Sequence, residues 1–539
     1  MTDLQIVYVV VFAVMSIVGF LSMYVDKTKA KRRKWRTPEW VLFLIAVLFG
    51  GVGSTAGMYV LDIRPDIGTS KFLCRVLRLS TLWRLRFCAS TSRNNLTMMS
   101  EYTDENFVPE KNRYAETLSE FIKCKTISDE RFFDKTEFDK FLSFIKGRFP
   151  LVFEKGEYKD FNGGIMIKID GKSHDEPLVL MSHYDVVQEN GKWSFDAWSG
   201  KVENGVVYGR GAVDTKGSLA AIFESVESLL SEGFAFSNDL YIISSSREEI
   251  AGTDVPDMVK YLADNGVKPK LVIDEGGGIV DPPVPGVSGK CAMIGMIERS
   301  SARVVVEFTN KDGKNAAANM AEFIEKTQKK VFGRRDFGPV NTAMFNAMKP
   351  KMNGAMKFVF SNLCVFKPLL IKLLPKVNKS AASLLGATVA FVTPSDKENL
   401  DLPSNAIRIV ARISGNYYNK IDDLVDEFTA FAKEFGAETK VVSKRETPAP
   451  EPLDSDGFKF VKGVTECVFP GVTVAPFCVL GGTDARHFIG KSQSVIRFAP
   501  IYMNNQQFSS FHNKDENISV DSVADAVRFY REAIKRFNK

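Results

Sequence analysis

Histidine is scarce in this chain, with four residues among 539, and cysteine occurs only as seven scattered residues. No two cysteines have the C-x-x-C spacing of a zinc ribbon or a thiol redox site, and they form no disulfide framework. No internal repeat or low-complexity tract stands out. The chemistry of the chain is therefore to be sought in its few histidines and its acidic residues.

A net positive charge is lacking over most of the chain. Residues 1–94 contain 14 Lys and Arg and 5 Asp and Glu, whereas the net charge of the whole chain is only +6. The rest of the chain is therefore net acidic and lacks the excess of basic residues that nucleic-acid-binding domains carry. We expect no nucleic-acid partner. At this length we expect two or three folded units joined by linkers.

Charge is also absent from two long runs near the N-terminus. Residues 6–25 and 41–61 contain no charged side chain, and each run is long enough to cross the roughly 30 Å hydrocarbon core of a bilayer as a helix. A cleaved signal peptide fits less well, because no basic segment precedes the first run. We therefore predict a multi-pass membrane protein, with two transmembrane helices in residues 1–66 and the lipid bilayer as a partner.

The sequence leaves the membrane side of the catalytic part open. The loop between the two runs is basic, and the positive-inside rule places it in the cytoplasm, which favours an extracytoplasmic side for the rest of the chain. Residues 71–86, however, form another basic segment with an amphipathic pattern, and such helices usually lie on the anionic face of a membrane. We assign residues 67–99 to this segment and the linker after it.

Two of the four histidines occur in a pattern that suits two metal ions. His183 ends an apolar run as His-x-Asp, acidic residues follow further apolar runs or a Gly-rich turn, and His512 lies near the C-terminus. Zinc takes imidazole nitrogen and carboxylate oxygen, and two zinc ions need a bridging carboxylate. We therefore expect two Zn²⁺ per chain, for which Co²⁺ or Mn²⁺ could substitute. The expected ligands are His183 and Asp274 on one ion, Glu249 and His512 on the other, and Asp214 between them.

Two further carboxylates complete this pattern. Glu248 is expected to be the general base that takes a proton from the attacking water, because such a base must lie within hydrogen-bond reach of it. Asp185, two residues beyond His183, is expected to accept the ring N–H of that histidine and fix its tautomer. Each acidic residue alone would more often be a cap, a turn residue or a solvated charge, but together they favour a metal site.

The ordered motifs SHYDVV, GRGAVDTKG, SREE, VIDEGG and GGTDARHF, with the late histidine, resemble the co-catalytic zinc peptidase family that includes aminoacylase, succinyl-diaminopimelate desuccinylase and carboxypeptidase S. The resemblance covers about residues 100–539, and residues 5–65 are similar to a small bacterial family of membrane proteins of unknown function. The resemblance to the zinc peptidase family, together with the two predicted membrane spans, implies a membrane-anchored, zinc-dependent amidohydrolase or carboxypeptidase. The implied substrate is a dipeptide-like or N-acyl amino acid with a free carboxylate, bound by Arg486 and contacted by Asn399.

The chain departs from that family at one position. Where the family usually has Gly-His-x-Ser after the first strand of its lid, this chain has Gly313-Lys314-Asn315-Ala316. Lys314 is a candidate donor to the carbonyl oxygen in place of the missing histidine, and an exposed turn lysine is an equal interpretation. The missing histidine also keeps open a second function, a metal-binding, catalytically weak sensor or scaffold at the membrane, against which the intact Glu248 argues.

Alternating strands and helices in residues 100–296 predict a doubly wound α/β catalytic domain, with the metal ligands at the carboxyl ends of its strands. Residues 297–446 have the βαββαβ order of a ferredoxin-like lid, with a helical insertion at 338–385, and residues 447–539 return to the catalytic sheet. The resemblance implies a homodimer formed through the lid. The mixture of Phe, Leu, Met and Lys in the insertion is typical of core or inter-subunit packing, and a second membrane-contacting surface is a less favoured alternative. The resemblance also connects the insertion with an apolar acyl or peptide substrate.

Overall fold

The structure is a computed structural model, and it describes residues 21, 24, 25, 28, 104, 106–310, 315–377, 379–399 and 401–539. The chain divides into two compact units, Met1–Met98 and Met99–Lys539. The predicted membrane spans and the segment 71–86 lie almost wholly outside the described residues. Within the described part, no single helix has the length and hydropathy to cross a bilayer; Gly354–Ser361 and Leu363–Lys376 have them only as a pair, bent by 107°.

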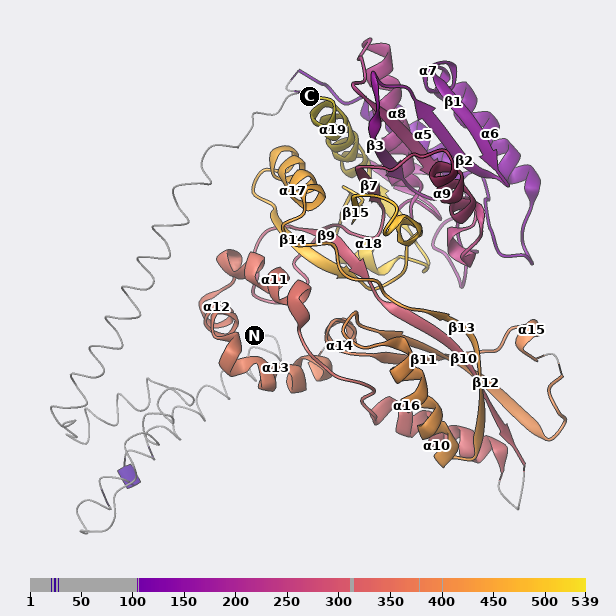
Figure 1. Cartoon of the computed structure of the whole chain (residues 1–539), viewed down its shortest axis with the longest axis vertical. Helices are drawn as coiled ribbons and strands as arrows, with labels where there is room; N and C mark the ends of the chain where they lie inside the picture. The colour runs from indigo at the N-terminus through magenta and orange to yellow at the C-terminus, as the bar shows by residue number, and fades with distance from the viewer. Residues whose placement is uncertain are drawn as a thin grey trace. The chain divides into compact units, whose positions relative to one another are not determined.

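The second unit is built on a ten-stranded mixed sheet in the order β1-β2-β6-β3-β7-β15-β9-β8-β16, with β14 paired to β9 (Figure 1). The strands β6, β3, β7 and β15 run parallel to one another. The strands are β1 (Gly156–Phe161), β2 (Gly164–Ile169), β3 (Ser173–Met181), β6 (Asn238–Ser244), β7 (Leu271–Asp274), β8 (Gly278–Val280), β9 (Cys291–Glu298), β14 (Thr473–Val479), β15 (Ser494–Arg497) and β16 (Tyr502–Met503).

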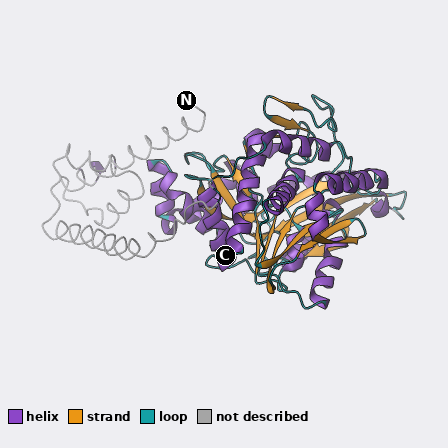
Figure 2. Cartoon of the chain, turned by 90° about the horizontal axis from the view of Figure 1, so that it is seen from above, coloured by secondary structure: helices purple, strands orange, loops and turns teal. Residues whose placement is uncertain are grey.

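Helices cover both faces of this sheet, which Figure 2 shows from above. Leu178 and Leu180 of β3 pack into one core cluster with α5, α8, α17 and α19, whereas Val179 and Met181 pack with α9 on the other face. Because successive strand residues point to opposite faces, a doubly covered strand is apolar throughout. The helices are α5 (Lys111–Ile122), α6 (Lys135–Arg148), α7 (Pro150–Lys155), α8 (Lys216–Ser231), α9 (Asp254–Asp264), α17 (Asp456–Val468) and α19 (Val520–Phe537). The predicted α/β character of the catalytic domain is confirmed.

Short elements connect these layers at the edge where the site lies. They are the 3-10 turns η1 (Glu248–Ile250) and η3 (Asp484–Phe488), the helix α18 (Asn505–Ser509), and a three-stranded sheet of β17 (Asn517–Ser519), β5 (Val206–Tyr208) and β4 (Val202–Glu203).

A second, four-stranded antiparallel sheet has the order β11-β12-β10-β13. The elements are β10 (Ser300–Thr309), α10 (Ala316–Lys329), β11 (Thr388–Val392), α15 (Asp396–Asn399), β12 (Ala406–Gly415), α16 (Ile421–Glu434) and β13 (Ala437–Arg445). Phe323 of α10 and Phe428 of α16 pack in one cluster with Val304 and Val306 of β10, so both helices cover the same face (Figure 1).

A run of helices separates α10 from β11. These helices are α11 (Gly338–Met348), η2 (Lys349–Lys351), α12 (Gly354–Ser361), α13 (Leu363–Val377) and α14 (Lys379–Leu385). Their inner side chains share a core with Met293 of β9 and Ala475 of β14. The insertion therefore packs against the large sheet.

Candidate metal centre

Three neighbouring parallel strands, β6, β3 and β7, end at one edge of the large sheet, and the predicted ligands follow these ends. His183 lies two residues beyond β3, Glu248 and Glu249 form the turn η1 after β6, and Asp274 is the last residue of β7. Since the carboxyl ends of parallel strands share one edge, residues far apart in the chain meet there.

Asp214, from the loop before α8, lies between the two histidines. Its Oδ1 is 3.2 Å from Nε2 of His183, and its Oδ2 is 2.9 Å from Nε2 of His512. The same nitrogen of His512 is 3.0 Å from Oε2 of Glu249. Each oxygen of one carboxylate thus faces a different imidazole, an arrangement that suits a carboxylate shared by two ions.

The group around His183 differs from the expectation in one ligand. The donor atoms of His183, Asp214 and Glu275 lie within 4.8 Å of one another, as do those of Asp214, Glu249 and His512. Asp274, which the sequence suggested, belongs to neither group: its oxygens accept N–H groups of Glu275 at 2.9 Å and of Ala485 at 2.8 Å. The geometry therefore favours Glu275 as the fifth ligand and gives Asp274 a positioning role.

Asp185 holds two parts of the site together, although not quite as expected. Nδ1 of His183 is 2.9 Å from the backbone oxygen of Asp185 and 3.4 Å from its Oδ1, so the carbonyl is the nearer acceptor. The carboxylate of Asp185 accepts the backbone N–H groups of Glu248 and Glu249, both at 3.1 Å. Because a carbonyl oxygen can only accept, Nδ1 of a neutral His183 must carry the ring proton. The lone pair of Nε2 is then available on the side of the ring that faces Asp214.

Glu516, which the sequence did not single out, fastens the loop that carries Asp214. Its carboxylate accepts the backbone N–H groups of Gly211, Val213 and Asp214 at 2.7–3.0 Å. It also pairs with Nη1 of Arg210 at 2.7 Å, and the two side chains are at most 1% exposed. The segment that carries His512 is thereby tied to the loop that carries Asp214.

Buried carboxylates crowd this edge of the sheet and are short of positive partners. Burial, together with the neighbouring carboxylates, raises the pKa values of Glu248, Glu249 and Glu275, and raises that of Asp484 to about 7. Oε1 of Glu249 and Oδ2 of Asp484 are buried without a hydrogen-bond partner among the described residues. Unpartnered carboxylate oxygens beside two imidazoles form a donor set that fits divalent cations such as zinc.

Burial acts to lower the pKa of His183, but hydrogen bonds with neighbouring carboxylates raise the pKa values of both metal-site histidines above the ordinary range. The hydrogen bonds with Asp214 and Glu249 raise the pKa of His512 to about 10. Burial acts to raise the pKa of Asp214, but the hydrogen bonds from His183 and His512 bring it below its ordinary value. Carboxylates that favour positive charge on the imidazoles favour it on a metal ion as well, and a bound metal would replace any proton on the ligand nitrogens.

Arg486 lies in η3, and the N–H of the preceding Ala485 donates to Oδ2 of Asp274 at 2.8 Å. Nη1 of Arg486 donates to the backbone oxygen of Thr483 at 2.7 Å, and its Nη2 is 3.5 Å from Oδ1 of Asp484. The N–H of Thr483 donates to Oε2 of Glu298 at 2.9 Å, and that carboxylate also binds Arg497 at 2.9 Å. Arg486 therefore lies beside the site with a guanidinium only partly engaged by its own loop.

The two other candidate substrate contacts, Asn399 and Lys314, are not placed at the metal site by the structure. Asn399 is exposed on α15 of the small sheet and is in neither metal group. Lys314 lies outside the described residues.

Arg445, at the end of β13, was not predicted from the sequence. It donates to the backbone oxygen of Arg299 at 3.2 Å. Burial lowers its pKa, and the charges of Arg486 and Glu248 are close enough to affect that pKa. A single arginine at a strand end carries no sequence signal for this position.

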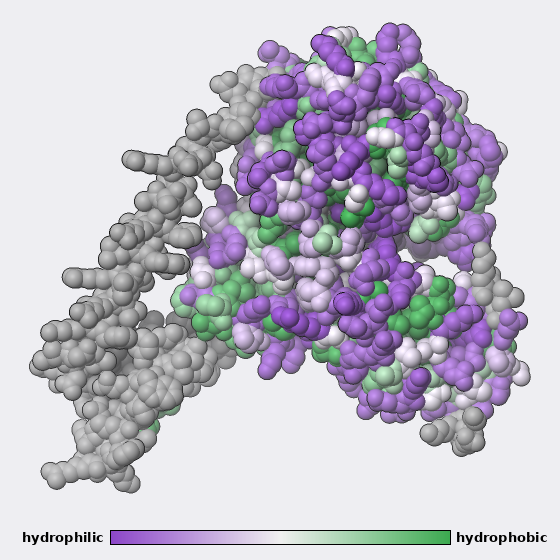
Figure 3. All heavy atoms as spheres, viewed as in Figure 1, coloured by the Kyte–Doolittle hydropathy of each residue, from purple (hydrophilic) through white to green (hydrophobic). Residues whose placement is uncertain are grey.

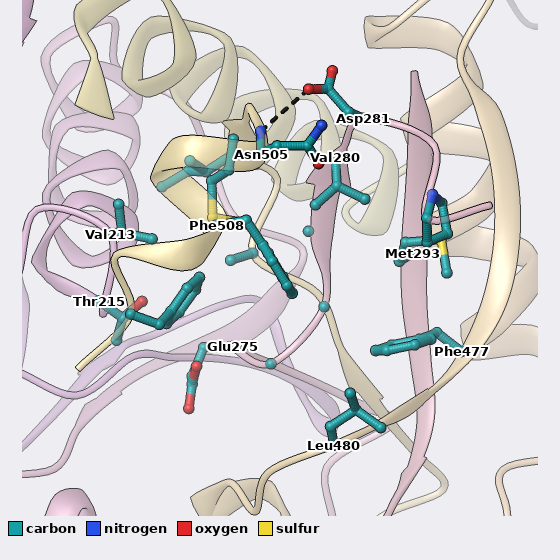
Figure 4. A pocket seen from close by; sticks show the side chains of 18 of the residues that line it. Val213, Thr215, Glu275, Val280, Asp281, Met293, Phe477, Leu480, Asn505 and Phe508 are labelled. Carbon is teal, nitrogen blue, oxygen red and sulfur yellow. Dashed lines mark hydrogen bonds between the residues drawn. The ribbon is translucent and has the colours of Figure 1, made fainter. Parts of the chain in front are cut away.

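A cavity of about 290 Å³ adjoins the metal group. Glu275 lies at one end of the cavity and Asp281 and Asn505 lie at the other, with apolar side chains between them (Figure 4). The apolar lining includes Val213, Val280, Met293, Leu384, Phe477, Leu480, Ile501, Met503, Phe508 and Phe511. Such a lining suits an apolar ligand group.

Comparisons with known proteins agree with this geometry. Residues 179–536 match the family described as peptidase family M20/M25/M40, and residues 16–62 match a protein family of unknown function, DUF1294. The chain is 28% identical over 449 residues to probable carboxypeptidase S-like 2 of Dictyostelium discoideum, covering 79% of this chain and 85% of that protein. It is 28% identical over 494 residues to N-fatty-acyl-amino acid synthase/hydrolase PM20D1 of Bos taurus, covering 86% and 96%.

Two solved structures share the fold. One is the M20 family metallo-carboxypeptidase Sso-CP2 from Sulfolobus solfataricus, with a TM-score of 0.59 at 17% identity, covering 79% of this chain and 99% of that chain. The other is human carnosine dipeptidase 1, with a TM-score of 0.56 at 12% identity, covering 79% and 96%.

Proposed function

The chain belongs to peptidase family M20/M25/M40 and is a hydrolase of amide bonds, and we propose that its substrates are N-acyl amino acids with an apolar acyl group. The observation that carries this proposal is the apolar cavity that begins at Glu275, beside the metal group. An acyl chain that enters this cavity is removed from water. This transfer contributes about 0.8 kcal/mol of binding free energy per buried CH₂. A dipeptide would place polar groups against the same apolar walls, so the cavity favours the acyl substrate.

The name of one relative supports the same substrate class, since the Bos taurus relative is named for N-fatty-acyl-amino acids. The Dictyostelium discoideum relative is named as a probable carboxypeptidase, which corresponds to the peptide alternative.

We propose that two zinc ions occupy the site. His183 and Glu275 would hold one ion and Glu249 and His512 the other, with Asp214 between them, in accordance with the two groups of donor atoms. When bound, such ions polarise the scissile carbonyl and lower the pKa of water.

Glu248 is the proposed proton carrier of the reaction. As a carboxylate it takes a proton from the attacking water, and it then gives that proton to the nitrogen of the leaving amino acid as the C–N bond breaks. Asp185 orients this residue by accepting its backbone N–H.

Arg486 is the proposed partner of the free carboxylate of the substrate, because a guanidinium can donate two parallel hydrogen bonds to a carboxylate.

We further propose that residues 1–66 anchor the chain in a bilayer. The small sheet is proposed to act as a lid and as the contact of a homodimer. The two uncharged runs and the match of residues 16–62 to DUF1294 support the anchor.

The test uses the full-length protein, stripped of metal and refilled with zinc, and measures amine release from dipeptides and from N-acyl amino acids of increasing acyl length. We expect kcat/KM to rise by up to roughly fourfold per CH₂ until the cavity is filled. Glu248→Gln should retain both ions and lose about 10²- to 10⁴-fold in rate. The exposed Glu203→Gln is the matched control and should be silent.

A preference for dipeptides would refute the acyl substrate. Near-full activity of Glu248→Gln would refute the role of that residue. An intact zinc content without turnover of any substrate would favour the metal-binding, catalytically weak alternative.

A further inference from the structure

Helices α12 and α13 expose a stripe of large apolar side chains. On α13, Val365, Leu369 and Leu373 are 51%, 52% and 47% exposed, and on α12 Phe358 is 57% exposed. The spacing of four residues places the three aliphatic side chains on one face of α13. Figure 3 shows hydrophobic surface gathered over these helices. Soluble surfaces rarely expose such a contiguous stripe without a partner.

The charge of the same region has a single sign. Residues 337–395 contain seven lysines and no arginine, aspartate or glutamate. Lys357 on α12 and Lys372 and Lys376 on α13 are exposed beside the stripe, whereas Lys367 is paired with Asp336 at 2.6 Å. The surface therefore combines apolar side chains with three lysines that pair with no acidic side chain in the described part of the chain.

We propose that this hairpin surface, formed by Lys357, Phe358, Val365, Leu369, Lys372, Leu373 and Lys376, lies in the headgroup layer of an anionic lipid bilayer. An apolar stripe flanked by lysines is the composition of helices that lie in the plane of a membrane interface. Anionic lipids attract lysines near their surface, and the charges complement each other.

Two other occupants fit the surface less well. The N-terminal segment of this chain, with 14 basic and 5 acidic residues in positions 1–94, carries charge of the same sign as the hairpin surface. A second copy that covers the surface symmetrically would bring two sets of lysines together. Like charges near each other are destabilising, and neither arrangement supplies the missing negative charge.

The inner face of the same helices reaches the substrate cavity. Leu370, Ile371 and Leu374 of α13 pack in the cluster that contains Met293 and Phe477, and both of these residues line the cavity. Leu384 of α14 lines it directly. The hairpin surface would thus hold one wall of the cavity close to the lipid phase in which acylated amphiphiles collect, although the lipid contact does not depend on the proposed activity.

The experiment places a fluorescent probe on the native Cys364, which is exposed on α13. Cys74, Cys88 and Cys467 are replaced by serine, and the buried Cys124, Cys291 and Cys478 remain. The full-length chain is reconstituted with phosphatidylcholine vesicles that contain nitroxide-bearing lipid, with and without phosphatidylglycerol. The control carries the probe at Val442→Cys with Cys364→Ser, because Val442 is 46% exposed on β13 of the small sheet.

We expect strong nitroxide quenching at Cys364 in the phosphatidylglycerol vesicles and little at Val442→Cys. Replacing Lys357, Lys372 and Lys376 with glutamate should remove the effect, since each lysine contributes roughly fivefold to partitioning onto an anionic surface. If this triple variant fails to fold, the comparison of the two probe positions in the otherwise unchanged chain still decides the question.

Three results would overturn the proposal. These are the absence of quenching at Cys364 with phosphatidylglycerol, equal quenching at the two positions, and energy transfer between labelled chains in place of lipid quenching, which would show that a second copy covers the surface. Vesicle flotation of the triple lysine variant, in which the hairpin surface no longer attracts anionic lipid, reports on the N-terminal anchor.

Discussion

Glu516→Ala should weaken the fold and the metal site together, although Glu516 belongs to neither group of metal donors. The substitution removes the acceptor of three backbone N–H groups and the partner of Arg210. Arg210 would stay 1% exposed, with a weak contact to the backbone oxygen of Gln188 at 3.5 Å and the ring of Trp193 at 5.1 Å. Neither contact neutralises a buried guanidinium.

The magnitude depends on that buried charge. Removing one partner of a buried ion pair costs about 3–5 kcal/mol, because the other charge is left without compensation. At about 2 °C per kcal/mol for a large domain, Tm should fall by roughly 6–10 °C. The freed loop also carries Asp214, so we expect the zinc content to fall as well.

The assay is thermal unfolding of the full-length protein with and without chelator, combined with metal analysis. The matched control is Asp264→Ala, which breaks an exposed pair with Lys260 and should cost less than about 1 kcal/mol. The double variant Arg210→Met with Glu516→Ala should recover part of the loss, because no unpaired charge remains. If Glu516→Ala melts like Asp264→Ala and binds zinc normally, the reasoning from the buried pair is wrong.

Three further predictions concern the site and the pH dependence. Glu275→Gln should lower the zinc content toward one ion per chain while Asp274→Asn retains more, and the opposite order in metal analysis would restore Asp274 as the ligand. Arg486→Lys should reduce kcat/KM on an N-acyl amino acid far more than on its amide analogue, because lysine keeps the charge but loses the paired donors; equal losses would make Arg486 structural. Burial acts to raise the pKa of Asp104, but hydrogen bonds from Arg531 and Lys535 bring it below its ordinary value. This carboxylate therefore stabilises the fold above the unfolded-state pKa of about 3.9 and loses that effect as the pH falls further, so Asp104→Asn should lower Tm at pH 6 and much less at pH 3.

The local patterns of the sequence were sufficient for the main elements. Leu219, Ile222, Val226 and Leu229 recur at helical spacing, and the structure has α8 there. The continuous apolar run at residues 178–181 becomes part of a strand covered on both faces. These features depend on periodicity and burial, which a single segment records in its own residues. The placement of polar residues after apolar strands likewise indicated which edge of the sheet carries the site.

Only the tertiary structure determined the features that depend on residues far apart in the sequence. The sequence has Asp274 and Glu275 side by side, and only the end of β7 and the N–H of Ala485 determine which carboxylate faces His183. Glu516 lies about 300 positions from the N–H groups that it accepts, so no local motif marks it. The cavity, likewise, is lined by residues from both sequence segments of the catalytic domain, 100–296 and 447–539, and from the insertion. Sequence patterns report the periodicity of one segment, whereas a site is made by the chain's return to the same sheet edge, which is a property of the whole fold.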